Sequence, residues 1–486
     1  MKPHIVFFTE GSNRFGWGHI MRCFALAEAF AKKEFEVSFM VDGDSEATKI
    51  IKDFSVLMGN WKTEASFIEK ILFHDSIAII DSYHATIETY QFIKSKAKTI
   101  AFLDDYNRLD YPNGILINGT IGAEKIAYPA NPNKLMLVGS KFVIFRPEFT
   151  FPQPIRTFPE KIRTFLLMFG GTDPLHLTQK ILPLITKRYP TAKKHVIVGT
   201  ENYQKLSLHT GLDNYTLLHS HVEATLMRTL MLQSDLALSA AGQTINELAV
   251  CGLPAILFKS AQNQRYNLEG WKEKGFIPSF IDATDSWDTS ELTQLLDQMD
   301  AASERNDRST KGLTAIDTKG SARIASRILG AYYQTKIKLA HATKKDLLPL
   351  FKLTNNPQVR ANSFSTQLIT LNEHTTWFYH ILQMPDHPIY VFYLANRLVG
   401  QIRFDIDHSQ ATISISISPS FRGFYLAPYL LNKAVLKLHE QQPEVTLIHA
   451  FVKGKNVASQ NSFIAAGYTL YTIEENQVYH YQYFIL

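Results

Sequence analysis

The chain has 486 residues, and at roughly 150 residues per domain this length predicts about three domains and excludes a single small module. Hydrophobic residues make up 45% and charged residues 20%, which is typical of folded globular proteins and excludes disordered or collagen-like chains. The 50 Lys and Arg residues against 45 Asp and Glu residues give a net charge of +5, without long runs of like charge, so we expect no nucleic-acid partner.

The cysteine content and the apolar runs of the sequence indicate where in the cell the protein is expected. Cys23 and Cys251 are too few and too far apart for a disulfide framework or a metal cluster, which fits a reducing compartment. The apolar run at residues 5–8 is shorter than the core of a signal peptide, and no apolar run approaches the ~18 residues that cross a bilayer. We therefore expect a soluble, cytoplasmic protein with no membrane partner.

The first two thirds of the chain alternate short apolar runs with helix-period stretches, the pattern of parallel sheets with helices on both faces. A Pro-rich linker is predicted at 146–154, separating α/β domains over 1–147 and 155–332. Strands are predicted at 5–8, 37–41, 77–80, 99–103 and 135–138 in the first domain, and at 164–168, 195–198, 236–239 and 254–258 in the second.

The pattern changes beyond residue 332. Strands are predicted at 390–394, 398–405 and 412–418, separated by short turns, and a further strand at 447–452. Adjacent strands with short turns indicate antiparallel pairing, unlike the earlier part of the chain. The sequence therefore predicts a third, α+β domain over 337–486.

A Gly16-x-Gly18-His19-x-x-Arg22 motif follows the first strand and precedes a predicted helix. The glycines permit a tight turn at the carboxyl end of the strand, where open parallel sheets bind their ligands. His19 then lies in the first helical turn, where the positive end of the helix dipole favours the neutral imidazole that a general base requires. A histidine in such a place is otherwise a capping or packing residue.

This motif and those that follow it resemble the UDP-sugar hydrolases of pseudaminic acid biosynthesis, which have the two-domain GT-B fold of many glycosyltransferases. Three further segments follow in the same order as in that family: Asp81-Ser82-Tyr83, Asp104-Asp105 and Phe145-Arg146-Pro147. The resemblance implies that His19 activates water and that Tyr83 orients the sugar or the water. It also places Gly16, Gly18, Arg22, Asp81 and Arg146 at the substrate. Glu10, Phe8 and Trp17 depart from the family pattern. Asp104 and Asp105 taken alone are equally explained by turn or cap formation, and no metal is expected.

The second α/β domain carries a candidate nucleotide diphosphate site. Gly170-Gly171-Thr172-Asp173 follows the strand at 164–168, and backbone amides of such a turn can approach phosphate oxygens. Thr244-x-x-Glu247 follows the strand at 236–239 and is also a capping box. The resemblance implies instead that Glu247 holds the ribose hydroxyls, and that the UDP site includes Gly170, Gly171, Asp173, Gly242, Thr244, Asn263 and Gln264.

In the third domain, an Arg-Gly-x-x-x-Ala segment between strand 412–418 and helix 429–440 resembles the pyrophosphate loop of GNAT-type acetyltransferases. Segments 355–360 and 374–377 resemble helices of the branch that acetylates amino-sugar nucleotides. The resemblance implies acetyl-CoA as co-substrate, bound by Arg422, Gly423, Tyr425, Leu426, Ala427, Asn456 and Ser459. Tyr425 replaces a glycine, Phe463 replaces a tyrosine and Phe451 stands where an acid is common, so the module is either active or degenerate. The nearest titratable candidates are His374 and His449.

The combined expectation is a bifunctional enzyme with small-molecule UDP-sugar substrates. The third domain would acetylate the 4-amino group of UDP-4-amino-4,6-dideoxy-N-acetyl-altrosamine. The first two would hydrolyse the product, UDP-2,4-diacetamido-2,4,6-trideoxy-beta-L-altropyranose, to UDP and free sugar with inversion. The alternatives are a GT-B glycosyltransferase that uses a UDP-N-acetylhexosamine and a non-catalytic nucleotide-sugar binding protein.

Overall fold

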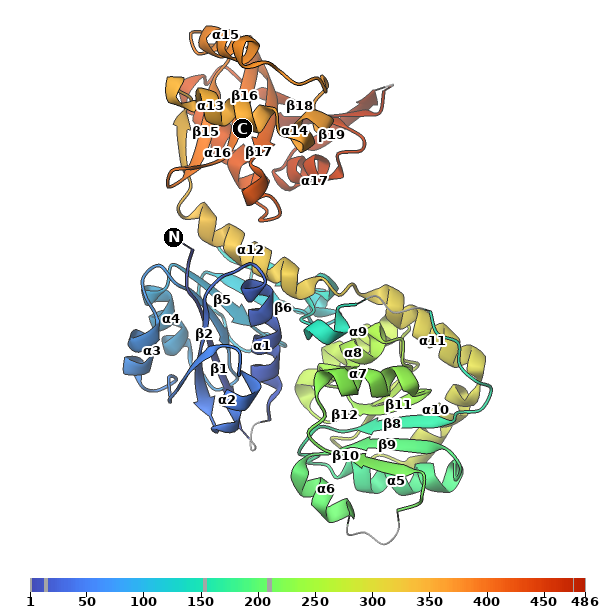
Figure 1. Cartoon of the computed structure of the whole chain (residues 1–486). Coiled ribbons are helices and arrows are strands. Elements are labelled where there is room, and N and C mark those ends of the chain that lie inside the picture. Colours follow the sequence, from blue (N-terminus) through green and yellow to red (C-terminus); the bar gives the residue numbers. More distant parts are fainter. Residues whose placement is uncertain (1, 13–15, 152–154, 208–211, 475, 486) are drawn as a thin grey trace. The chain divides into compact units, whose positions relative to one another are not determined.

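The computed structural model describes residues 2–12, 16–151, 155–207, 212–474 and 476–485, which form three β-sheets with flanking helices (Figure 1). Residues 152–154 of the predicted linker lie outside the described residues. The chain divides into two compact units, Met1–Ala325 and Ser326–Leu486. The first unit contains two of the sheets, and the boundary falls inside helix α12 (Gly320–Gln334).

The first sheet is parallel, with the strand order β3-β2-β1-β4-β5-β6-β7. Its strands are β1 (Ile5–Gly11), β2 (Val37–Gly43), β3 (Ser55–Met58), β4 (Ile77–Asp81), β5 (Thr99–Leu103), β6 (Ile115–Asn118) and β7 (Leu135–Val138). The helices are α1 (Gly18–Ala31), α2 (Glu46–Ile50), α3 (Ala65–Ile71) and α4 (Ile87–Lys96), with 3-10 turns η1 (Ala123–Lys125), η2 (Ser140–Phe142) and η3 (Pro147–Phe149). The predicted parallel α/β pattern is confirmed here.

The strand order reverses beside β1, which lies between β2 and β4. Such a switch point leaves a crevice at the carboxyl ends of the strands, because the following loops turn to opposite faces of the sheet. The register pairs Thr9 with Asp81, so the last residue of β4 lies beside the carboxyl-terminal part of β1, which continues to Gly11. This edge is where the Gly16–Arg22 motif and the Asp81–Tyr83 segment meet.

The second sheet is also parallel, in the order β10-β9-β8-β11-β12-β13. Its strands are β8 (Thr164–Met168), β9 (Lys193–Ile197), β10 (Thr216–His219), β11 (Leu236–Ala240), β12 (Ala255–Lys259) and β13 (Phe280–Asp282). The helices are α5 (Leu177–Arg188), α6 (Thr200–Ser207), α7 (Ala224–Gln233), α8 (Thr244–Val250), α9 (Arg265–Glu273), α10 (Thr289–Asp300) and α11 (Ala302–Ala315), with the 3-10 turn η4 (Gln262–Gln264). Alternate residues of β8 enter separate cores, Leu166 on one face and Phe165 on the other, as expected for a sheet covered on both sides.

The third sheet has the order β14-β15-β16-β17-β18-β20-β19, and its pairs are antiparallel except for β17 and β18. Its strands are β14 (Lys338–His341), β15 (Ile389–Leu394), β16 (Arg397–Asp407), β17 (Gln410–Ile417), β18 (Leu447–Lys453), β19 (Thr469–Glu474) and β20 (Val478–Phe484). The helices are α13 (Leu347–Thr354), α14 (Pro357–Asn362), α15 (Leu371–Ile381), α16 (Ala427–Gln441) and α17 (Val457–Ala465), with 3-10 turns η5 (Lys344–Asp346) and η6 (Pro419–Phe421). The predicted antiparallel pairing of β15, β16 and β17 is confirmed.

None of the helices among the described residues is both long and apolar enough to cross a membrane.

Candidate active site

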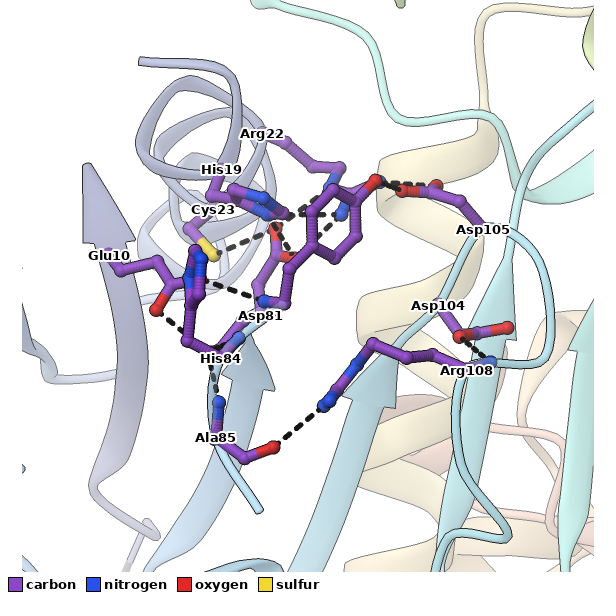
Figure 2. A network of polar contacts seen from close by, with 12 residues as sticks. Glu10, His19, Arg22, Cys23, Asp81, His84, Ala85, Asp104, Asp105 and Arg108 are labelled. Carbon is purple, nitrogen blue, oxygen red and sulfur yellow. Dashed lines mark hydrogen bonds and ion pairs between the residues drawn. The ribbon is translucent and has the colours of Figure 1, made fainter. Parts of the chain in front are cut away.

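His19 and Asp81 form the centre of the candidate site in the first unit. His19 lies in the first turn of α1, and its Nδ1 is 2.7 Å from Oδ1 of Asp81 at the end of β4. The Asp81 side chain is 1% exposed and that of His19 is 13% exposed. A carboxylate that accepts the Nδ1 proton fixes the ring and its tautomer, which leaves Nε2 of the neutral imidazole with its lone pair. Figure 2 shows both side chains at the carboxyl edge of the sheet.

Arg22 lies one helical turn after His19, on the same face of α1. Its Nη2 and Nε donate to the two oxygens of Asp81 at 2.6 and 2.8 Å, and its Nη1 donates to Asp105 at 2.6 Å. Although burial opposes the charged form, Arg22 and His19 hold the pKa of the Asp81 carboxyl well below its ordinary value. The guanidinium therefore fixes Asp81 as a carboxylate and links it to Asp105 (Figure 2).

Tyr83 connects this cluster to the second sheet. Its hydroxyl donates to Asp105 and accepts from Nδ2 of Asn263 in η4 at 3.1 Å. The ring stands edge-on to His19, with centroids 4.3 Å apart. Burial, and next the Asp105 carboxylate, raise the pKa of Tyr83 well above its ordinary value, so the residue stays a phenol. Asn263 Oδ1 is buried and has no hydrogen-bond partner among the described residues.

The neighbouring aspartates have different roles. Asp104 accepts hydrogen bonds from the backbone N–H groups of Asn107 and Arg108 and from the hydroxyls of Tyr111 and Tyr128, at 2.6 to 3.1 Å. Asp105 instead contacts Arg22 and Tyr83. Of the alternatives that the sequence leaves open, turn formation therefore holds for Asp104, while Asp105 belongs to the site.

We expect Asp104→Ala to destabilise the first unit by about 3 kcal/mol, because it leaves the buried Tyr111 hydroxyl and three half-buried donors without this acceptor. The measurement is native-state hydrogen exchange of the β5 amides, which reports the opening free energy of this unit. Asp104→Asn, which keeps one acceptor oxygen, serves as the milder control and should lose less. A loss below about 1 kcal/mol in the alanine variant would contradict this role.

Glu10 organises the turn that carries Tyr83. Its side chain is 1% exposed, accepting from Lys62 Nζ at 2.7 Å and Ser82 Oγ at 2.8 Å. The other oxygen accepts from the Tyr83 backbone N–H at 2.8 Å and lies 2.7 Å from His84 Nδ1. The sequence identified Glu10 only as a departure and missed Lys62, because no local pattern links a residue after β3 to the end of β1.

The glycines of the two parallel sheets leave space for a ligand. Gly16 (φ +82°) and Gly18 flank the start of α1, and Gly170 (φ +86°), Gly171 and Gly242 follow β8 and β11. A Cβ placed on any of these five would meet no other atom within 4 Å. Backbone at all five positions is therefore open to close approach, as the predicted sugar and diphosphate contacts require.

Asp173, a predicted substrate contact, is otherwise engaged. Its two carboxylate oxygens accept from the backbone N–H groups of Leu177 and Thr178 at 2.9 and 2.8 Å, and the residue is 3% exposed. These are the first amides of α5. Asp173 therefore shapes the turn after β8 as a helix cap, and direct substrate binding by its carboxylate is not what the geometry shows.

Glu247 and Arg146, both predicted at the substrate, contact each other. Arg146 Nε and Nη2 donate to the two Glu247 oxygens, each at 2.7 Å. Thr244 is the first residue of α8, whose N-cap is Gln243 without a side-chain cap, so the alternative of a Thr244–Glu247 capping box is wrong. Gln264 Oε1 accepts from the Ser260 backbone N–H at 2.8 Å and so holds its own turn, unlike Asn263.

In the second unit, the predicted pyrophosphate loop begins α16. Gly423 has φ +80°, and a Cβ there would meet no atom within 4 Å. Tyr425 has φ +56°, the left-handed conformation that favours glycine. Its ring is 44% exposed, with the Arg327 guanidinium 4.7 Å from its centroid. The bulky residue thus keeps the glycine-type backbone. Leu426 is the N-cap and Ala427 the first residue of the helix.

Other predicted contacts of the second unit are structural. Arg422 Nε donates to the Ile417 carbonyl at 2.9 Å, and its other nitrogens contact Gln358 and Asn356. Asn456 Oδ1 accepts from the Ser459 backbone N–H at 3.2 Å and caps α17. These side chains therefore hold the loops around the candidate CoA site in place.

Phe463 and Phe451, which depart from the acetyltransferase pattern, pack against neighbouring aromatic rings. Phe463 is 3% exposed and packs edge-on to Tyr468 in the core. Phe451 stacks on His480, with centroids 4.4 Å apart. His374 is 2% exposed among aromatic rings, so it is a core histidine and not an accessible site residue.

Strands β17 and β18 form a fork. They pair at three positions, from Gln410↔Leu447 to Thr412↔His449, although both strands continue. Beyond this point, the facing edges of 413–417 and 450–453 are not paired to each other. Unpaired strand edges offer backbone donors and acceptors to an extended ligand.

Among the described residues, no group of three or more His, Cys, Asp or Glu side chains is arranged to hold a metal ion. Cys23 and Cys251 are both buried and free.

Comparison with known proteins places these observations in context. Residues 165–327 match the glycosyltransferase family 28 C-terminal domain. An uncharacterized protein of Methanocaldococcus jannaschii is 24% identical over 284 residues, which cover 56% of this chain and 58% of that protein. The spore coat polysaccharide biosynthesis protein SpsG of Bacillus subtilis is 21% identical over 278 residues, covering 56% of this chain and 82% of its own length. The family model lies within the second α/β domain, and the chain spans 58% of the length of the Methanocaldococcus jannaschii relative.

Solved structures with similarity include a spermidine N-acetyltransferase from Vibrio cholerae in complex with CoA and spermine, at 18% identity and a TM-score of 0.29. It covers 31% of this chain and 96% of the acetyltransferase. A domain from Methanocaldococcus jannaschii is 17% identical with a TM-score of 0.28, covering 31% of this chain and 99% of that domain.

Proposed function

We propose that the first unit hydrolyses UDP-2,4-diacetamido-2,4,6-trideoxy-beta-L-altropyranose to UDP and free sugar, with inversion at C1. The observation that carries this proposal is the contact between His19 Nδ1 and the buried Asp81 carboxylate at the switch point of the first sheet. A base held by a carboxylate through one nitrogen presents the other nitrogen to a reacting molecule. The motif order described above supplies the substrate class.

In the proposed reaction, His19 Nε2 accepts a proton from water while the water oxygen attacks C1. The bond from C1 to the diphosphate oxygen breaks, and UDP leaves with the electron pair. Because a diphosphate is a stable anion, its departure requires no protein acid. The backbone at Gly170, Gly171 and Gly242 is open to close approach and suits the growing charge. Tyr83, held by Asp105 and Asn263, would orient the sugar or the water.

We expect Gly171→Ala to raise the KM for the UDP-sugar about tenfold or more, equivalent to about 1.4 kcal/mol of binding. The added Cβ meets no protein atom within 4 Å, so folding should be unaffected while the space for the diphosphate is reduced. Steady-state kinetics and the thermal midpoint are to be measured together. Unchanged KM in a folded variant would remove Gly171 from the diphosphate site.

The test of hydrolysis is incubation of the purified chain with the UDP-sugar and no acceptor. UDP release is followed continuously, and NMR identifies the anomer of the free sugar first formed. Hydrolysis predicts rapid release of UDP and an inverted product. Binding without release would contradict the proposal.

A glycosyltransferase is the second candidate, favoured by the family match over residues 165–327. A transferase would use the same nucleotide side but would transfer the sugar to an acceptor hydroxyl. It predicts almost no UDP release without an acceptor, and stimulation when an acceptor is supplied. The same assay therefore separates the two activities.

For the second unit we propose acetyl-CoA-dependent acetylation of the 4-amino group of UDP-4-amino-4,6-dideoxy-N-acetyl-altrosamine. Two features support it: a loop with glycine-type backbone at Gly423 and Tyr425 before α16, and the fork between β17 and β18. Amides at a helix start suit a pyrophosphate, and the fork suits the extended arm of CoA. The test is release of free thiol from acetyl-CoA in the presence of the amino sugar nucleotide. A flat trace would remove this activity.

A further inference from the structure

The fork between β17 and β18 is closed at one end and open at the other. The paired positions lie at the amino ends of β17 and β18, so the strands separate toward Ile417 and Lys453. The Arg422–Ala427 loop follows the carboxyl end of β17 and therefore lies at the open end. The five residues 413–417 span about 16 Å at 3.3 Å per residue. A ligand anchored at the loop and extended along the fork ends at its vertex, where Thr412 pairs with His449.

His449 occupies the half-exposed face of β18. Ile448, Ala450 and Val452 of this strand are buried in the core, and alternation places His449 and Lys453 on the opposite face. Lys453 Nζ donates to the backbone carbonyls of Ala361, in the last turn of α14, and of Ser363, just after it, so the end of this helix borders the same face. His449 thus lies beside the vertex on an accessible side of the sheet.

His449 belongs to a chain of polar contacts. Its Nδ1 is 2.8 Å from His480 Nε2 on β20, and its Nε2 is 2.9 Å from Gln410 Oε1 on β17. Phe451 stacks on the His480 ring, and Tyr471 meets that ring edge-on at 5.2 Å. Two tautomeric arrangements satisfy the imidazole pair: His480 donates to His449, or His449 donates to His480. The contact with Gln410 Oε1 corresponds to the first arrangement, because an amide oxygen accepts and His449 Nε2 must then donate. In the second arrangement the Gln410 amide turns its NH2 group toward His449, whose Nε2 then carries a lone pair.

The surroundings favour uncharged imidazoles at neutral pH. Burial, and next the adjacent His480, lower the pKa of His449. Burial lowers the pKa of His480, while Glu474 on β19 opposes this shift. The other charged groups on neighbouring strands are otherwise engaged: Asp405 with His387, Arg403 with the Trp377 ring, and Lys453 with backbone carbonyls.

We propose that His449 is the catalytic base of the acyl transfer, with His480 as the residue that receives its proton; this inference rests on the acetyl transfer proposed above. The amine nitrogen attacks the thioester carbonyl carbon, the C–N bond forms, and the C–S bond breaks with the electron pair leaving on sulfur. The amine proton passes to His449 Nε2, while the Nδ1 proton passes to His480 Nε2. Water protonates the thiolate. Glu474 stabilises the resulting imidazolium of His480, and Gln410, on the exposed end of β17, yields its place at Nε2 to the amine.

The test uses His449→Gln in the full chain, with acetyl-CoA and UDP-4-amino-4,6-dideoxy-N-acetyl-altrosamine as substrates. We expect kcat at pH 7 to fall about 100-fold or more, because a positioned base contributes at least this factor. The KM for acetyl-CoA should stay unchanged, since the loop and the fork are intact. The loss of kcat relative to the wild-type protein should become smaller at higher pH, where more of the substrate amine is already unprotonated. His408→Asn is the matched control, because His408 lies in an exposed turn at φ +54°, which asparagine tolerates.

His480→Gln is the second variant, and it keeps the proposal testable if His449→Gln fails to fold. It retains the base but removes the proton acceptor behind it, so kcat should fall less and the acid limb of the pH profile should move. Wild-type transfer with unchanged kcat and pH profile in folded His449→Gln, or in His480→Gln where the first is unfolded, overturns the assignment. Absence of transfer by the wild-type protein, with CoA binding checked by calorimetry, overturns the proposed acetylation itself and this inference with it.

Discussion

His19→Asn is expected to reduce UDP release from the sugar nucleotide by about 100- to 10,000-fold, the range attributed to a positioned general base. Asparagine keeps a hydrogen-bonding group near Asp81 but supplies no basic nitrogen to water. Nucleotide binding should persist, because the open glycines after β8 and β11 are untouched. The measurement is continuous detection of UDP at saturating substrate, together with UDP affinity by calorimetry.

The control for this variant is His74→Asn, which changes an exposed histidine of the same unit. It should release UDP at the wild-type rate. Asp81→Asn should resemble His19→Asn, because loss of the carboxylate removes the acceptor that orients the ring. Unchanged turnover in folded His19→Asn would show that another group activates water, and absence of turnover in every form would favour a binding protein.

The strands that the sequence shows most clearly are buried on both faces. In β1 and β4 every residue is buried, and each strand begins with four consecutive apolar residues. The strands β3, β10 and β19 were missed because their residues are half-buried or exposed and carry no such run. Burial therefore helps to reveal a strand but does not decide it, because the short β6 is buried throughout and is not predicted, whereas the mostly half-buried β7 is.

The sequence predicts several residues of the candidate site, but not the contacts that they make with one another. His19 and Arg22 are one helical turn apart and could be assigned to one helix face from spacing. Their shared contact with Asp81 depends on β4 lying beside β1, a choice of strand order that local pattern does not encode. The same holds for Arg146 with Glu247, which lie in sequence segments 101 residues apart.

Tyr425 shows how a departure from a family pattern can be accommodated. In sequence it places a side chain where a glycine is usual, which raises the question of whether the loop keeps its shape. The structure gives it the left-handed backbone of that glycine and an exposed ring beside Arg327. The identity of the residue could be read from the sequence, but the direction of its side chain required the fold.

Arg22→Met should destabilise the first parallel sheet by about 3–5 kcal/mol at pH 7, the cost of leaving a buried charge without its partner. Methionine nearly fills the volume of the arginine stem but leaves the Asp81 carboxylate with His19 and the weak donor Cys23 Sγ, and Asp105 with Tyr83. Because the chain has more than one unit, global denaturation would mix transitions. Native-state hydrogen exchange of the β1 and β4 amides reports the opening free energy of this sheet.

The pH dependence of stability distinguishes the loss of the Arg22 charge beside Asp81 from a simple loss of side-chain packing. In the wild-type protein the pKa of Asp81 is held well below its ordinary value, so its stabilising contribution is complete above about pH 4 and is lost only as pH falls toward the folded-state pKa. In Arg22→Met the buried Asp81 carboxylate has lost its main cationic partner, so burial moves its pKa upward and protonation relieves the variant already above about pH 4. The difference in stability between the two proteins should therefore begin to narrow above about pH 4 and continue to narrow below it. Arg22→Lys, which keeps the charge without the bidentate geometry, should lie between the two. A pH-independent difference, or a loss below about 1 kcal/mol, would show that packing alone accounts for Arg22.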